Sequence, residues 1–216
     1  MFGFLKKFML TGYLKFEEDK IRFGKDGLVF YFTPQLVSEH EANWAVGGLR
    51  YGCAQYIAAK YEGHRFVKNH GVSMLKTLTP VVKLSLEVLQ NFGWGRLKTY
   101  KVDEKKGFMV ITGKSTLAEE IKRLSRPQDH PIDFMLGGLF AGALEYFSEE
   151  KIYTVEIVCC SQKDRQSCTF VSGTPESIYG YVEEFAPETR GWAEQVIEET
   201  SRTEEEIKKR GGLQWL

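Results

Sequence analysis

The chain has 216 residues, with 29 Lys and Arg against 29 Asp and Glu, and therefore no formal net charge at pH 7. Hydrophobic residues make up 43% and charged residues 27%, a composition that is ordinary for a globular domain and excludes wholesale disorder. Zero net charge excludes the overall basic footprint of a duplex-DNA-binding protein, so no nucleic-acid partner is expected. No stretch approaches the roughly 18 apolar residues of a transmembrane helix.

The N-terminal part is predicted to form three short strands followed by a helix. The strands are Gly12–Phe16, Lys20–Phe23 and Leu28–Phe32, which are separated by turns rich in acidic residues or glycine. A helix is expected over about Val37–Tyr61, and Gly63 is expected to end it.

A second helix is predicted at about Ser73–Phe92. Pro80 lies inside its apolar pattern, which indicates either a kink or a late start near Thr79. Two strands follow, Arg96–Val102 and Phe108–Thr112, and the polar residues between them predict a hairpin turn.

The C-terminal half adds a helix that Pro131 opens and that runs to about Phe147. The strands Ile152–Cys159 and Cys168–Val171 then form a second predicted hairpin, and Thr174 is expected to cap a further helix. Strands that are grouped between helices and joined by hairpins predict an α+β fold, with an antiparallel sheet packed with helices. We expect a single domain over residues 1–187 and a charged helical tail over 188–216.

Three of the four cysteines, Cys159, Cys160 and Cys168, fall within ten residues, whereas Cys53 lies apart from them. The first ten residues have lysines inside their apolar run and no small-residue cleavage site, so no secretory signal is visible and a cytoplasmic location is expected. Thiols stay reduced in that compartment. A cysteine cluster there is more typical of metal binding or redox chemistry than of a structural disulfide.

The segment from residue 133 to 170 carries the most specific pattern. It contains Gly137-Gly-Leu-Phe-Ala-Gly142, then Glu156-Ile-Val-Cys159-Cys160, then Cys168-Thr-Phe170, with Ser115-Thr-Leu-Ala118 upstream. This pattern resembles the 4-vinyl-reductase domain family of small-molecule-binding domains, over roughly residues 92–172. The resemblance implies a fold similar to that of subunits of the TRAPP membrane-tethering complexes and of haem-based nitric-oxide sensors.

Among relatives in this family, the sensor domains of aromatic-responsive transcriptional activators hold zinc through a cysteine at the start of the glycine-bearing helix, a glutamate and two further cysteines. The resemblance places Glu156, Cys159 and Cys168 on three of these ligand positions. It places Asp133 on the fourth, where those relatives have cysteine. The interval from Cys159 to Cys168 is one residue longer than usual, which makes Cys160 an alternative ligand. The resemblance therefore implies a structural zinc site.

Strand geometry bears on the choice between the two neighbouring cysteines. Residues three apart in a regular strand point to opposite faces, so Glu156 and Cys159 cannot both point inward, whereas Glu156 and Cys160 can. Either the chain turns at Val158, or Cys160 is the ligand. His130, three residues before the predicted helix-start ligand, is a substitute donor. Without a metal, the same cysteines would pack as small hydrophobic side chains.

Aromatic and small side chains are the candidates for contacting a bound apolar molecule. They are Tyr51, Trp94, Phe134, Gly138, Phe140 and Ala141. Each aromatic ring can equally well fill the hydrophobic core. The spacing of Gly138 and Gly142 leaves two alternatives, space for a ligand or tight helix packing, and we favour tight packing.

The predicted function is that of a sensor-like binding module, which holds an apolar or aromatic small molecule and forms a homodimer. The chain has no G-x-G-x-x-G after a strand, no P-loop and no H-E-x-x-H pattern, so we expect binding without catalysis. One alternative is a reductase of a tetrapyrrole vinyl group, or an accessory protein of such a reductase. The other is an adaptor that assembles with partner proteins. A sensing module of this kind would need a separate output protein.

Overall fold

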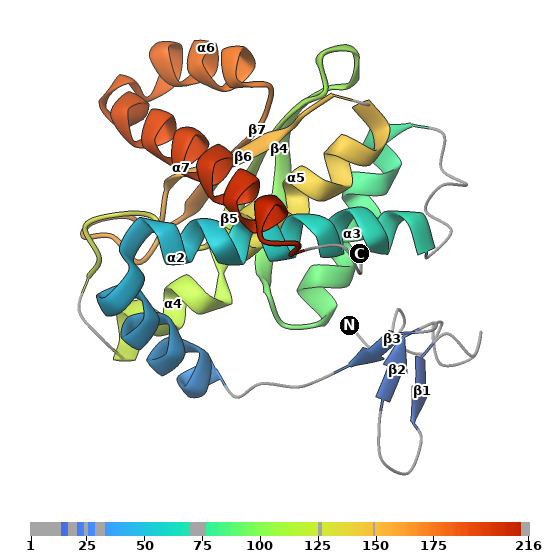
Figure 1. Cartoon of the computed structure of the whole chain (residues 1–216), viewed down its shortest axis with the longest axis horizontal. Helices are drawn as coiled ribbons and strands as arrows, with labels where there is room; N and C mark the ends of the chain where they lie inside the picture. Colours follow the sequence, from blue (N-terminus) through green and yellow to red (C-terminus); the bar gives the residue numbers. More distant parts are fainter. Residues whose placement is uncertain are drawn as a thin grey trace.

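The computed structural model describes residues 14–16, 21–23, 26–28, 33–69, 77–124, 127–148 and 150–212 (Figure 1). Strands β1 (Leu14–Phe16), β2 (Ile21–Phe23) and β3 (Asp26–Leu28) form a small antiparallel sheet. A second antiparallel sheet has four strands in the order β4-β5-β7-β6, and helices pack against it. The predicted α+β class is therefore confirmed.

The larger sheet consists of β4 (Gly95–Asp103), β5 (Phe108–Ser115), β6 (Tyr153–Val158) and β7 (Cys168–Gly173). The α-helices are α2 (Thr33–Asn69), α3 (Leu78–Asn91), α4 (Thr116–Leu124), α5 (Phe134–Ser148), α6 (Pro175–Phe185) and α7 (Arg190–Lys209). Two single turns of 3-10 helix lie at Glu104–Lys106 and Pro187–Thr189. Among the helices of the described ranges, none combines the length and the apolar character that a membrane crossing requires.

Local signals in the sequence correctly predicted several element boundaries. Both hairpins form, with β4 paired to β5 and β6 paired to β7. Helix α3 starts at Leu78, so Pro80 lies in its first turn, where a missing N–H group is tolerated. The Oγ1 atom of Thr174 accepts a hydrogen bond from the backbone N–H of Ser177 (3.4 Å), which caps α6.

The third strand differs from the prediction. It covers Asp26–Leu28 and not Leu28–Phe32, because Phe23 pairs with Asp26 and Ile21 pairs with Leu28. Residues 29–32 lie outside the described part of the chain, as do residues 12, 13 and 20 of the other predicted strands.

Helix α2 is longer than predicted and is bent at a different glycine. It continues through Gly63 to Asn69. Gly63 does not end the helix. It lies directly against the backbone of Leu139 on α5, where a side chain would collide. The bend occurs at Gly48, whose φ of 53° and ψ of −140° are not helical. An L-residue with a side chain rarely adopts such a positive φ, so glycine permits this bend.

Helices α2 and α5 pack with their backbones in close approach, and Figure 1 shows α2 crossing α5. A Cβ atom on Gly138 would overlap the carbonyl oxygen of Tyr56, and one on Gly142 would overlap the carbonyl oxygen of Lys60. The two glycines therefore serve tight helix packing, as predicted from their spacing in the sequence. This contact fixes α2 against the helix that starts beside the cysteine cluster.

The predicted C-terminal tail forms α7, which packs against α2 and beside β6 (Figure 1). The side chains of Ala193, Val196 and Ile197 are buried there. The Oγ1 atom of Thr200 donates a hydrogen bond to the Sγ atom of Cys53 (3.4 Å). Helix α7 thus contributes to the main hydrophobic core, although its sequence is mostly charged.

A pair of glycine substitutions tests the helix contact. We expect Gly142→Ala to lower the free energy of unfolding by about 3 kcal/mol, because the new methyl group overlaps the backbone of α2. Gly180→Ala is the control, since nothing lies within 4 Å of the added Cβ atom. It should raise that free energy by roughly 0.5–1 kcal/mol through helix propensity. Urea unfolding measures both values, and equal effects of the two changes would contradict the proposed contact.

Candidate metal centre and aromatic pocket

Three buried side chains from the β6–β7 hairpin bring potential metal ligands together. A carboxylate oxygen of Glu156 and the Sγ atoms of Cys159 and Cys168 all lie within 4.8 Å of one another. The two Sγ atoms are 3.9 Å apart. With Zn–S bonds of about 2.3 Å, two sulfurs on a tetrahedral zinc lie about 3.8 Å apart. The spacing of these donors therefore fits a zinc ion.

A β-bulge in β6 explains how Glu156 and Cys159 can face the same point. Glu156 pairs with Phe170 and Val158 pairs with Thr169, so the β6 strand has one extra residue at this position. Such a bulge changes the side to which the following residues point. Cys159 follows the end of β6, and its backbone N–H donates to the Oε1 atom of Gln162 (2.9 Å). Of the two predicted alternatives, the chain takes the irregular path near Val158.

The carboxylate of Glu156 is half satisfied by hydrogen bonds. Its Oε2 atom accepts from the backbone N–H groups of Ile132 (3.0 Å) and Asp133 (2.8 Å), just before α5. Its Oε1 atom is buried and has no hydrogen-bond partner among the described residues. Burial, together with the charge of Asp133, raises the pKa of Glu156 to about 8. An unpartnered buried carboxylate oxygen beside two thiols is the arrangement that a bound cation would stabilise.

Asp133 is the N-cap residue of α5, whereas the sequence predicted it inside a helix opened by Pro131. Its Oδ1 atom accepts a hydrogen bond from the backbone N–H of Leu136 (3.1 Å), and its Oδ2 atom accepts one from the Ser115 hydroxyl. Burial raises the pKa of Asp133 to about 6. Both of its carboxylate oxygens therefore have partners. Within the described residues, Asp133 does not belong to the group formed by Glu156 and the two cysteines.

Cys160 lies beside the other two cysteines of the hairpin. Its Sγ atom is 3.6 Å from that of Cys168, and its backbone N–H donates to the Cys168 sulfur (3.3 Å). Burial raises the pKa of Cys159 well above its ordinary value, whereas hydrogen bonds from the neighbouring thiols lower the pKa of Cys160. A divalent cation would favour the thiolate form of these cysteines, because it compensates the negative charge.

His130 lies in a stack of rings and not beside the cysteines. Its ring stacks on Trp44 with centroids 4.2 Å apart, and Trp192 lies 5.9 Å away. The ring of His40 also stacks on Trp44, with centroids 5.8 Å apart. The Nε2 atom of His130 is buried without a hydrogen-bond partner among the described residues. Burial lowers the pKa of both histidines, so both are neutral at pH 7.

A small cavity lies between the carboxylates and the aromatic stack. Its volume is about 10 Å³, close to the smallest space that holds one water molecule. The residues that line it come from α2, the start of α5, β6 and α7, and they are Tyr56, Pro131, Asp133, Phe134, Gly137, Thr154, Glu156, Trp192 and Val196. The cavity therefore adjoins both the candidate metal ligands and the rings.

Of the described residues that line this cavity, Phe134 is also one of the predicted ligand contacts. Gly138 faces the backbone of α2, and the ring of Phe140 packs edge-on against Phe170 (5.5 Å). Ala141 is fully buried in the core. Trp94 lies between α3 and β4, where its backbone carbonyl accepts a hydrogen bond from Thr116.

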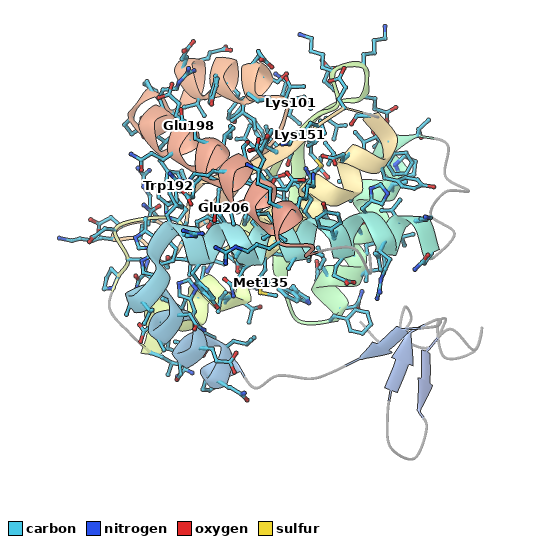
Figure 2. The ribbon with its side chains drawn as sticks, viewed as in Figure 1. Lys101, Met135, Lys151, Trp192, Glu198 and Glu206 are labelled. Carbon is cyan, nitrogen blue, oxygen red and sulfur yellow. The ribbon has the colours of Figure 1, made fainter. Side chains whose placement is uncertain are left out.

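Tyr51 lies near the bend of α2. Its Oη atom accepts hydrogen bonds from the side-chain amides of Gln55 (2.6 Å) and Asn43 (3.3 Å). Sequence reasoning did not identify Trp44 and Trp192 as site residues, although Trp192 is a tryptophan on a mostly charged helix. Figure 2 places Trp192 near the start of α7, and its Nε1 atom donates to the carbonyl oxygen of Glu156 (3.1 Å).

Comparison with known proteins identifies the fold. No protein-family model matches the chain, and no curated protein sequence matches it. Its structural neighbours include the phenol-responsive sensory domain of the transcription activator PoxR, determined with phenol, at a TM-score of 0.66 and 14% identity. That match covers 78% of this chain and 88% of the sensory domain. Another neighbour is a vinyl-4-reductase family protein from Methanocaldococcus jannaschii, at a TM-score of 0.42 and 15% identity, covering 67% and 82% of the two chains. The chain thus shares its fold with the first of these two structures.

The buried carboxylates predict a pH dependence for the metal-free protein. The folded state holds the Glu156 proton to a higher pH than the unfolded chain does, with a pKa of about 8 against an ordinary 4.5. Between these values the folded state binds more protons, so the free energy of unfolding should fall as pH rises. Glu156→Gln should flatten that fall, as measured by urea unfolding in the presence of a chelator. Glu150→Gln, at an exposed carboxylate, is the control, and an unchanged slope in Glu156→Gln would refute the assignment.

Proposed function

We propose that this protein is a sensor-like module that binds an apolar or aromatic small molecule and is braced by a structural zinc ion. The observation that carries this proposal is the ring cluster of half-buried Trp44, His130 and Trp192 around the buried Phe134, in which the buried Nε2 atom of His130 has no partner among the described residues. Ligand pockets are mostly apolar and contain few polar groups, which fix the orientation of the ligand. The fold shared with a phenol-responsive sensory domain supports this proposal.

His130 supplies the polar anchor in this proposal. Its neutral ring stacks on Trp44, which fixes the ring plane, and its Nε2 atom can exchange a hydrogen bond with a hydroxyl group on the ligand. A buried polar group that is left unpaired favours ligands that can satisfy it. We therefore propose a hydroxylated aromatic molecule of about the size of phenol.

Binding such a molecule requires the rings to separate, because the present cavity holds about one water molecule. Trp44 lies on the first half of α2, before the non-helical residue Gly48. A change of the backbone angles at Gly48 would move Trp44 away from His130 and Phe134 without disturbing the packing of α2 on α5. In this proposal the domain forms a homodimer in the cytoplasm, and ligand entry is passed to a separate output protein.

Zinc has a structural role in this proposal. Glu156, Cys159 and Cys168 would hold it, and Asp133 and Cys160 are the candidates for the fourth position. The ion would supply positive charge to a buried group of acidic side chains, and it would tie the hairpin to the start of α5. The unpartnered Oε1 atom of Glu156 and the sulfur spacing support this assignment.

Native mass spectrometry of protein that is purified without added metal or chelator tests the zinc proposal. We expect one zinc-sized mass per chain. Cys168→Ser should lower the zinc content at least about tenfold, since it removes a ligand. Cys53→Ser is the matched control, because Cys53 is an equally buried cysteine that contacts Thr200 and Val196 on α7. A wild-type protein without zinc, or equal loss in both variants, would contradict the proposal.

Calorimetric titration with phenol and with toluene tests the ligand proposal. We expect phenol to bind, and His130→Phe to weaken phenol binding by about tenfold, because the ring remains but its hydrogen bond is lost. Toluene, which has no hydroxyl group, should bind to wild type and variant with similar affinity. His64→Phe is the control at a histidine on the surface of α2. If His130→Phe leaves the preference for phenol over toluene unchanged, His130 is not the anchor.

A further inference from the structure

A second cavity, separate from the metal centre, lies between the C-terminal parts of α2 and α7 and the middle of α5. Its volume is about 470 Å³, which falls within the range of small-molecule sites. The residues that matter most for its chemistry are Lys60, His64, Lys68, Glu145, Glu204 and Lys208. Its lining is thus strongly charged, whereas the chain as a whole has no net charge.

A buried lysine lies at this cavity. Lys60 is 7% exposed, and its Nζ atom donates to the carbonyl oxygen of Ile152 (3.1 Å) and pairs with Glu145 (2.5 Å). The ring of Tyr153 lies 5.5 Å from the same nitrogen. Burying an ammonium group is costly unless it is paired and hydrogen-bonded. These contacts hold the positive charge of Lys60 in place at the wall of the cavity.

The carboxylates of the cavity are already compensated by lysines. Glu204 is 8% exposed and pairs with Lys208 (2.7 Å) and with Lys151 (3.3 Å), which Figure 2 labels. The same lysines lower the pKa of Glu204, although its burial opposes this effect. Glu204 therefore stays ionised. Each acidic group in the cavity has at least one cationic partner before any ligand arrives.

Positive charge remains in excess around this cavity. Arg65 pairs with Glu62 at 3.4 Å, and both side chains are substantially exposed, so their attraction is weak. Lys68, in the last turn of α2, has no ion-pair partner within the described ranges. The four cations Lys60, Arg65, Lys68 and Lys208 thus line the cavity with two carboxylates, Glu145 and Glu204, which leaves an excess of two positive charges.

We propose that this cavity binds the phosphate group of a phosphate monoester. A phosphate monoester carries close to two negative charges at pH 7, which matches the excess. Lysine ammonium groups bind phosphate as point charges, and the side chains of Tyr61, His64 and Asn69 in the same lining add hydrogen-bonding groups. A concave wall with one dominant sign of charge also concentrates anions. The remaining volume accommodates a small organic group on the ester.

Isothermal titration with glycerol 3-phosphate at constant ionic strength tests this site. We expect saturable binding to the full chain, and a loss of affinity of at least about tenfold in the double variant Lys68→Gln and Lys208→Gln. Both side chains are exposed, and Glu204 keeps Lys151 as a partner, so the variant should fold, which circular dichroism checks. Lys163→Gln is the matched control at another basic surface, formed with Lys122 and Arg165, and it should leave the affinity unchanged.

The same proteins are then sedimented with vesicles that contain phosphatidate, which carries the same phosphate monoester on a lipid. Binding of glycerol 3-phosphate that depends on Lys68 and Lys208 assigns the site to a soluble ligand. If the protein binds the vesicles through Lys68 and Lys208 but does not bind glycerol 3-phosphate, the phosphate belongs to a lipid headgroup. Binding of neither, or equal losses in the double variant and in Lys163→Gln, would overturn the proposed site.

Discussion

The buried carboxylate of Glu156 connects most of the elements around the candidate site. Its side chain accepts hydrogen bonds from the two residues that precede α5, and its backbone carbonyl accepts one from Trp192 on α7. A carboxylate oxygen of Glu156 also lies within 4.8 Å of the sulfurs of Cys159 and Cys168, which adjoin β6 and β7. Glu156 therefore joins the start of α5, helix α7 and the cysteines of the hairpin. The positions of Asp133 and of the aromatic cavity follow from these contacts.

The same arrangement separates the acidic side chains of the candidate metal centre from the neutral aromatic rings. Glu156 and the cysteines concentrate acidic groups on one side, where burial raises the pKa values of Glu156 and Cys159 and makes a cation favourable. On the other side, burial lowers the pKa of His130 and keeps its ring neutral among Trp44 and Phe134. A neutral ring in an apolar stack suits a neutral aromatic ligand. The structural metal and the ligand pocket are therefore adjacent but chemically distinct in our proposal.

Features set by local chemistry could be predicted from the sequence, whereas features set by distant contacts could not. The cap at Thr174 and the hairpins depend on neighbouring residues, and they were predicted correctly. The start of α3 at Leu78 corresponds to the late start, one of the two alternatives that Pro80 left open. Gly63 is typical of a helix end in sequence, but the helix continues through it. Its lack of a side chain makes room for the backbone of Leu139 on α5. The bulge in β6, and the approach of Trp192 to Glu156, likewise depend on tertiary packing that a polar helical pattern does not encode.

Two side chains on successive turns of α2 connect the small cavity beside Trp192 (the aromatic cavity) to the lysine-lined cavity (the basic cavity). The Oη atom of Tyr56, which lines the aromatic cavity, accepts a hydrogen bond from the backbone N–H of Thr154 (2.8 Å). Lys60, which lines the basic cavity, donates to the carbonyl oxygen of Ile152 (3.1 Å). Because both bonds join the same face of α2 to the same end of β6, a shift of α2 along that strand would strain both of them together. The two cavities thus lie along neighbouring turns of α2, and the close contact of α2 with Gly138 and Gly142 keeps both turns in place.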